Sequence, residues 1–243
     1  MREDNIIGAF RSESFADVPR IAKAIRFFVF GDFCKILPKG MLYMQKTKFF
    51  SPRKMAMTAI MSAVASVLMF FSFSVPLMPG FIKLDFSELP ALIAAFSMGP
   101  LSGAAVCFVK NLVNVLSTTT AGAGELCNFL MGVTFVVPAG LIYKKHESLK
   151  GAATASFIGA TVMALLSLPI NYFISYPAYG IFYGLTTEKI LSMYQIINPN
   201  VENLFEALLW FNTPYTFIKG LLNVLLTFLV YKRLSPIIKG TAK

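Results

Sequence analysis

Two long stretches without a charged residue constrain this chain more than any other feature. Residues 55–82 carry no Asp, Glu, Lys or Arg for 28 positions, and residues 151–187 carry none for 37. A helix at the surface of a soluble domain needs a polar face toward water, whereas about 20 apolar residues are enough to cross a bilayer. The sequence therefore predicts a polytopic, all-α membrane protein. It excludes a soluble enzyme and a disordered chain as descriptions of the whole protein.

The composition agrees with this class and disfavours two kinds of site. Only 14% of the residues are charged, against about 25% in a typical soluble domain. The net charge of +10 would suit nucleic acid, but the basic residues gather beside the apolar runs, where they act as topology signals. We therefore expect no nucleic-acid partner. The only histidine, His146, and the cysteines Cys34, Cys107 and Cys127 have no metal-ligand spacing, so we expect no metal.

The first 50 residues form a separate basic extension. They contain no early apolar core and no cleavage site, so no cleavable signal peptide is predicted. Within them, residues 17–30 have the pattern of a basic amphipathic helix, with Asp17 as N-cap and Pro19 in the first turn. Such a helix suits an anionic membrane surface. The alternative is an extension with no role in the membrane domain, which covers residues 51–235 and precedes a basic tail at 236–243.

The apolar runs predict a bundle of six membrane-spanning helices. Their expected limits are 55–78, 89–98, 100–117, 126–143, 152–176 and 213–231. The second and third share one apolar stretch, which is interrupted by Gly99 and Pro100 and is too short for two full spans. We read it as a short helix, a tight turn and a second helix. A single span there, giving five helices, is the alternative.

The distribution of basic residues favours six spans with both termini in the cytoplasm. In that topology only Lys83 and Lys189 lie in outer loops, and eleven Lys and Arg flank the membrane inside. This asymmetry follows the positive-inside rule, and five spans would place one basic cluster against it. The eleven are Lys46, Lys48, Arg53, Lys54, Lys144, Lys145, Lys150, Lys232, Arg233, Lys239 and Lys243.

Three ionisable residues lie in or beside apolar segments and need an explanation. They are Lys110, Glu125 and Lys219. A lone lysine at mid-bilayer costs about 2.5–3.5 kcal/mol on insertion scales, so such residues normally face a cavity or a partner. The six-span topology places all three in the outer half of the bundle. We favour a polar pocket open to the exterior, because several amides lie nearby; the alternative is a buried Lys–Glu pair that only ties helices together. The amides are Asn111, Asn114, Asn128 and Asn171.

Two small-residue features suggest close contacts. The segment 117–125 is rich in Thr, Ala and Gly and lies before a predicted helix, where its backbone can approach a ligand. Its lack of a Gly-Lys-Ser/Thr ending argues against a nucleotide site. Ala59 and Ala63, one turn apart in the first span, form a small-xxx-small pair. This pair suits either a partner helix or ordinary packing inside the bundle.

Catalytic patterns are poor. The sequence has no carboxylate pair at metal spacing and no Gly-x-Ser-x-Gly, so we do not expect an enzyme. A membrane enzyme that acts on a lipid is the alternative from a different functional class.

Several ordered motifs resemble those of the S components of energy-coupling factor (ECF) vitamin transporters, above all the riboflavin-binding ones. The resemblance covers about residues 51–234. Riboflavin-binding relatives often carry Asn three positions before the lysine of the last motif, where this chain has Thr216. The motifs are Lys83-Leu-Asp-Phe-Ser-Glu-Leu-Pro90, Gly99-Pro-Leu-Ser-Gly103, Lys110-Asn111, Gly122-Ala-Gly-Glu125 with Asn128-Phe129, and Thr213-Pro-Tyr-Thr-Phe-Ile-Lys-Gly220.

The resemblance implies a function and a set of partners. The expected protein binds riboflavin, or FMN, as a substrate on the outer side and has no cofactor. Uptake is powered by two cytoplasmic ATPases through a transmembrane T component, which Ala59 and Ala63 are expected to contact. An S component for another vitamin, such as thiamine, folate or a queuosine precursor, is the alternative within the family.

The resemblance, together with the chemistry of a flavin, also implies a set of site residues. The flavin ring edge needs amide or ammonium partners, the ribityl chain needs polar groups, and the ring needs a flat apolar slot. We expect Asn171, Thr216 and Lys219 at the ring edge. Gly122, Glu125 and Asn128 are expected at the ribityl chain, with Lys83 and Asp85 in a closing loop.

Overall fold

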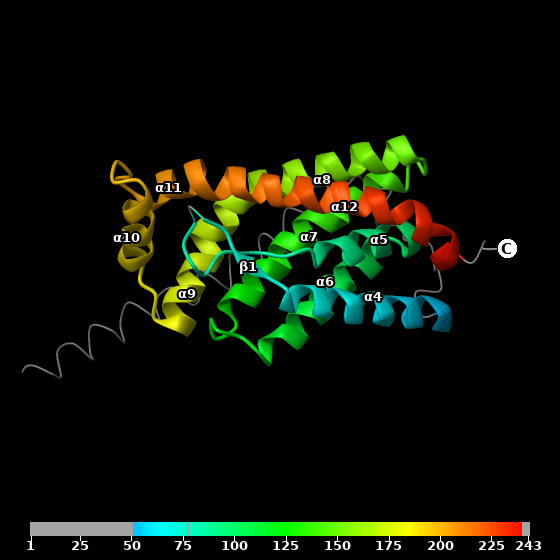
Figure 1. The fold of residues 1–243 in the computed structure, drawn as a ribbon, viewed down its shortest axis with the longest axis horizontal. Coiled ribbons are helices and arrows are strands. Elements are labelled where there is room, and N and C mark those ends of the chain that lie inside the picture. The colour runs from blue at the N-terminus through cyan, green and yellow to red at the C-terminus, as the bar shows by residue number, and fades with distance from the viewer. Residues whose placement is uncertain (1–50, 77, 240–243) are drawn as a thin grey trace, which may run out of the picture.

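A computed structural model describes residues 51–76 and 78–239 of the chain (Figure 1). The predicted N-terminal extension, with its amphipathic helix at 17–30, lies outside the described residues. So do residues 240–243 of the basic tail.

The described chain is mainly a bundle of long helices. Four segments are long and apolar enough to cross a membrane, and two apolar helices are shorter, which confirms the all-α membrane class. The long segments contain α4 (Pro52–Phe70), α7 (Ala123–Tyr143), α8 (Leu149–Ile170) and α12 (Thr213–Lys239), and the shorter helices are α5 (Glu88–Met98) and α6 (Pro100–Val115).

The first predicted span, 55–78, is too long, because α4 ends at Phe70. The residues that follow are apolar enough for a membrane helix, but Pro76 and Pro79 cannot continue one. The Phe and Val residues between Phe70 and Pro76 favour extended backbone. Apolarity alone does not separate these two conformations.

The connection from α4 to α5 returns into the bundle. It contains β1 (Phe73–Ser74) and β2 (Lys83–Leu84), which pair antiparallel with Phe73 opposite Leu84. After β2 the chain enters the protein, because Asp85, Ser87 and Glu88 are all buried. As a result α5 starts at depth, with its first residue among other helices.

Helix α5 is the central element of the bundle, with α4, α6, α7 and α12 packed around it (Figure 1). Its residues from Ala91 to Ala94 are completely buried. The predicted tight turn after it is present: Gly99 has φ 107°, and Pro100 opens α6. Close packing continues along α6, where a Cβ on Gly103 would come within 2.8 Å of the Ala91 carbonyl oxygen.

The fifth and sixth helical segments are longer than predicted, and both contain π-helical turns. The fifth runs from α8 through η3 (Asn171–Ser175) into α9 (Tyr176–Tyr183), past its predicted end at 176. The sixth begins with α11 (Leu204–Ala207) and η4 (Leu208–Asn212) before α12, ahead of its predicted start at 213.

Helix α10 (Thr187–Ile197) closes one end of the molecule, together with α9 and α11 (Figure 1). These elements share a second apolar cluster that includes Tyr176, Ile190 and Tyr194. The opposite end holds the start of α4, the α5–α6 turn and the α7–α8 connection, and α12 ends there (Figure 1).

Candidate ligand-binding site

A cavity of about 300 Å³ lies between the β1–β2 connection, α7, the end of α8, α9 and α12. This volume is at the lower end of the range of about 300–1,000 Å³ for small-molecule sites. Its lining combines buried charges, amides and aromatic rings. The polar lining includes Lys83, Asp85, Glu88, Glu125, Asn128, Asn171, Asn212, Thr216 and Lys219, and the aromatic lining is Phe70, Phe81, Tyr176, Tyr179 and Tyr215.

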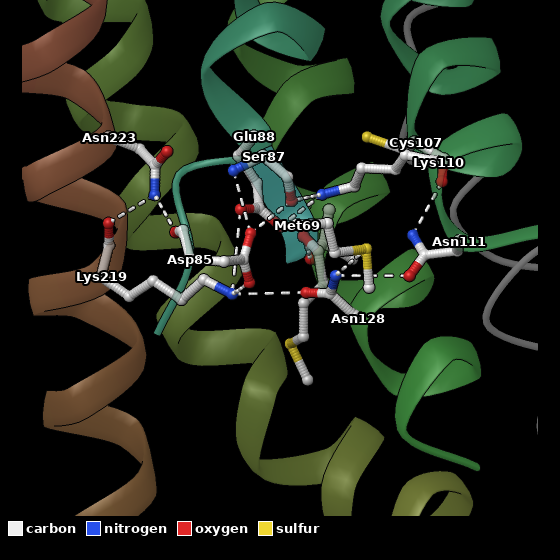
Figure 2. A network of polar contacts seen from close by, with 12 residues as sticks. Met69, Asp85, Ser87, Glu88, Cys107, Lys110, Asn111, Asn128, Lys219 and Asn223 are labelled. Atoms are coloured by element: carbon white, nitrogen blue, oxygen red, sulfur yellow. Dashed lines mark hydrogen bonds and ion pairs between the residues drawn. The ribbon is translucent and has the colours of Figure 1, made fainter. Parts of the chain in front are cut away.

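One wall of the cavity is an ion pair between distant parts of the chain (Figure 2). Lys219 Nζ on α12 donates to Asp85 Oδ2 at 2.9 Å and to Asn128 Oδ1 at 3.3 Å. Its distance to Glu88 Oε2 is 3.8 Å. Lys219 and Asp85 are both largely buried, with side-chain exposures of 12% and 5%. The two predicted site residues therefore lie together, and each satisfies the other's charge.

A second ion pair lies behind the first one. Lys110, which is completely buried, reaches Glu88 Oε1 at 3.0 Å and also donates to Ser87 Oγ. The Ser87 hydroxyl donates to Asp85 Oδ1, so the two pairs form one network (Figure 2). Two lysines and two carboxylates leave no formal net charge, which is how such residues are tolerated inside a membrane domain.

The local fold favours carboxylates at this position. Glu88 is in the first turn of α5, where the partial positive charge of a helix N-terminus stabilises an anion. Asp85 lies three residues before Glu88, with Lys219 Nζ at 2.9 Å from Oδ2 and the Ser87 hydroxyl donating to Oδ1.

A buried Lys–Glu pair, the alternative drawn from the sequence, does exist between Lys110 and Glu88, but Glu125 is not part of it. That glutamate instead organises the predicted small-residue loop: it accepts hydrogen bonds from Asn114 Nδ2 at 3.0 Å, Thr118 Oγ1 at 2.8 Å and Thr120 Oγ1 at 3.3 Å. Glu125 also lines the cavity. By accepting these bonds, the Glu125 carboxylate holds the hydroxyl-rich loop beside the cavity.

Gly122 is not in the lining of the cavity, although the sequence placed it at the ligand. It precedes α7 with φ 90°, and its N–H donates to Thr118 Oγ1 at 3.2 Å. Gly124, two residues later, lines the cavity instead. The role of Gly122 here is to turn the chain into α7.

The remaining predicted site residues all line the cavity. Asn128 links Lys219 to Asn111, because its Nδ2 donates to Asn111 Oδ1 at 3.3 Å. Asn171 Oδ1 accepts from the Cys127 thiol at 3.2 Å. Lys83 is exposed on β2, at the mouth of the cavity.

The aromatic wall could not be chosen from sequence. Phe81 contacts Tyr179 at 5.0 Å and Tyr176 at 6.0 Å between ring centroids, and the second pair is nearly perpendicular. The Tyr176 hydroxyl is 2.7 Å from that of Tyr194, which ties α10 to the wall. With 24 Phe in the chain, no spacing marks Phe81 as a wall residue.

Sequence reasoning also missed Glu88 and Asn212. A usable signal existed for Glu88: lysines within a membrane domain pair with acids, and Glu88 stands directly before the apolar run that precedes Lys110. Asn212 carried no such signal, because its position depends on the π-helical turn before α12.

Ala59 and Ala63 lie on an exposed face of α4, beside the exposed Ile60 and Val64. They do not pack inside the bundle, which was one of the two readings of the pair. Within the described residues, no group of three or more His, Cys, Asp or Glu side chains could hold a metal ion.

These features define a class: an apolar helical membrane protein with an internal, charge-balanced cavity for a small organic molecule. The chain belongs to the substrate-specific (S) components of ECF transporters, because it matches the family described as "ECF transporter, substrate-specific component" over residues 53–231. The resemblance seen in the motifs is thereby confirmed. The chain is a transporter subunit and not an enzyme.

Curated relatives and a solved structure agree with this assignment. The chain is 34% identical to the riboflavin transporter RibU of Staphylococcus aureus over 77% of its length and 93% of the relative's. It is 31% identical to the riboflavin transporter FmnP of Bacillus subtilis, covering 76% and 93%. A solved S component of a bacterial ECF transporter matches with a TM-score of 0.61 and 32% identity, over 77% of this chain and 98% of that one.

Proposed function

We propose that this chain is the riboflavin-binding S component of an ECF importer. It captures the vitamin on the outer side of the cell membrane and passes it on with the help of a T component and two cytoplasmic ATPases. The observation that carries the proposal is the cavity, which joins a charge-balanced polar wall to an aromatic wall in a chain similar to proteins named riboflavin transporters.

The lining of the cavity matches the parts of a flavin. The uncharged tricyclic ring suits the apolar and aromatic side built by Phe81, Tyr176 and Tyr179. The ring's carbonyl and imide edge suits Lys219 and the amides. The ribityl hydroxyls suit the hydroxyl-rich loop held by Glu125, and FMN would add a phosphate that the exposed Lys83 can meet.

The positions of the basic residues support a topology of six passes with cytoplasmic termini. The start of α4 carries Arg53 and Lys54, and the α7–α8 connection carries Lys144 and Lys145. Both lie at the end of the bundle opposite α10 (Figure 1). Under the positive-inside rule this end faces the cytoplasm. The cavity then opens toward the outside of the cell. Helix α5 is too short to cross the bilayer alone, so we count it as a membrane pass together with the connection that precedes it.

The exposed face of α4 is the proposed docking surface for the T component. Ala59 and Ala63 leave the backbone accessible there, and helices associate closely in lipid where small residues meet. The same face carries no ionisable side chain between Met55 and Phe70.

Ligand identification tests the proposal. The full-length protein, purified in mild detergent from cells that make riboflavin, should carry a yellow chromophore that elutes as riboflavin after denaturation. Titration of the ligand-free protein with riboflavin, FMN and thiamine should rank riboflavin first. A preparation that binds thiamine or folate and no flavin would assign the chain to another vitamin.

A further inference from the structure

Two asparagines of the cavity lie at π-helical turns. Asn171 is the first residue of η3, and Asn212 is the last residue of η4. Both are buried, and both line the cavity. A π-helical turn inserts an extra residue into a helix and frequently occurs at a functional site. Each turn here carries an asparagine that faces the cavity.

The sequence placed Thr216 at the ring edge, but the Thr216 hydroxyl already donates its proton to another protein atom. Its Oγ1 donates to the Asn212 carbonyl oxygen at 2.7 Å, one turn earlier in the same helical segment. A hydroxyl bonded in this way can still accept a hydrogen bond, but it has no second proton to donate. Thr216 therefore cannot reproduce the donor and acceptor pair of an asparagine.

The side-chain amide of Asn212 has the opposite status. The residue is 6% exposed, it lines the cavity, and its side-chain amide forms no hydrogen bond with any other described residue. The amides of Asn111, Asn128 and Asn223, in contrast, donate to protein atoms. Buried polar groups are normally paired, so this free amide points to a partner on the ligand.

We propose that Asn212 is a specificity-determining residue that binds the imide edge of the ligand's ring, in the place that the sequence gave to Thr216. The inference rests on the proposed flavin function. An imide presents an N–H between two carbonyl oxygens, and a carboxamide offers one donor group and one acceptor in the matching order. Asn171 is suitably placed to bind the same edge, because it also lines the cavity and directly follows α8, against which η4 packs.

Asn212 lies on the side of the cavity near α8 and α12. A ring bound there would be separate from the part of the cavity that suits the ribityl chain. Asn212 is flanked by the aromatic Phe211, which packs on Tyr194 at 5.7 Å. The hydroxyl-rich loop around Glu125 lies on α7 and the segment before it. A ligand that places its ring toward α12 leaves its hydroxylated chain for that loop.

The test compares Asn212→Ala with a matched control, Asn200→Ala, whose side chain is exposed and lies outside the cavity. The probes are riboflavin and lumiflavin, which has the same ring but no ribityl chain. We expect Asn212→Ala to lose about tenfold to a hundredfold in affinity for both probes, the cost of leaving a buried ligand group unpaired. The control should bind both as the wild type does, and Thr216→Val should lose less than Asn212→Ala.

Each other outcome overturns the inference. A loss with riboflavin alone would assign Asn212 to the ribityl chain, and unchanged affinity for both flavins would remove it from the site. If Asn212→Ala does not fold, as judged by thermal melting without ligand, Asn212→Asp provides the same test, because it keeps the shape and removes the donor. A wild-type protein that binds neither flavin refutes the proposed function itself, which is a separate result.

Discussion

Lys219 Nζ lies 2.9 Å from Asp85 Oδ2, although 134 positions separate the two residues in the chain. The contact fixes the connection before α5 to the second turn of α12. Asn223, one turn after Lys219, strengthens it, because its Nδ2 donates to the backbone carbonyls of both Lys219 and Asp85, at 3.0 and 3.5 Å. A ligand that contacts Lys219 or Asp85 is therefore coupled both to α12 and to the connection before α5.

Removal of the cation from this pair should be costly. Lys219→Met leaves Asp85 buried and short of its main counter-charge, and losing one partner of a buried pair costs about 3–5 kcal/mol. We expect a lower melting temperature in detergent and a flavin affinity weaker by about 1–3 kcal/mol. The double variant Lys219→Met/Asp85→Asn removes the stranded charge and should recover part of the stability. A double variant that melts no higher than the single one would contradict this account of the pair.

The buried lysines illustrate how far the sequence was informative. A charge inside an apolar run is costly, so the positions of Lys110 and Lys219 alone predicted a polar interior. Their partners depend on the path of residues 71–76 and 78–87, which passes back into the bundle. The sequence did not indicate this path, because an apolar run with prolines is compatible with the end of a membrane helix and also with an extended connection.

The aromatic wall and Asn212 mark a second limit. Phe81 and Asn212 reach the cavity through a loop conformation and a π-helical turn, and neither is set by local composition. In contrast, the Gly99–Pro100 turn was predictable, since Gly allows a positive φ and Pro suits the first turn of a helix. Features set by one or two neighbouring residues could be predicted from the sequence. Features that depend on packing between distant segments could not.

Gly103 should be intolerant of even a methyl group. A Cβ there would meet Val136 and come within 2.8 Å of the rigid Ala91 carbonyl oxygen, and overpacking costs about 1–3 kcal/mol. Intrinsic helix preference would favour alanine by about 1 kcal/mol, so a net loss of stability isolates the packing effect. The matched control is Gly80→Ala, where a Cβ has nothing within 4 Å. Thermal unfolding of the two variants should differ clearly, and equal melting temperatures would show that α5 and α6 can separate at little cost.

Deletion of residues 1–40 should leave flavin binding intact. Every residue that lines the cavity lies at or beyond Met69, so the deleted segment contributes no contact from within the described site. Equilibrium titration of the purified truncated protein with riboflavin should give the affinity of the full chain. A folded truncation that binds at least tenfold more weakly would make the basic extension part of the site.

Bulky residues at Ala59 or Ala63 should uncouple uptake from binding. Both alanines are on the exposed face of α4, away from the cavity lining, and association of helices in lipid depends on close approach of their backbones. Ala59→Trp or Ala63→Trp would hold a partner helix away without touching the ligand. We expect riboflavin uptake by cells to be abolished while the purified subunit keeps its flavin affinity. The control is Val67→Trp, further along the exposed side of the same helix and outside the small-residue pair, which should impair uptake less. A parallel fall of uptake and affinity would mean that the substitutions disturb the bundle, and unchanged uptake would place the T component on another face.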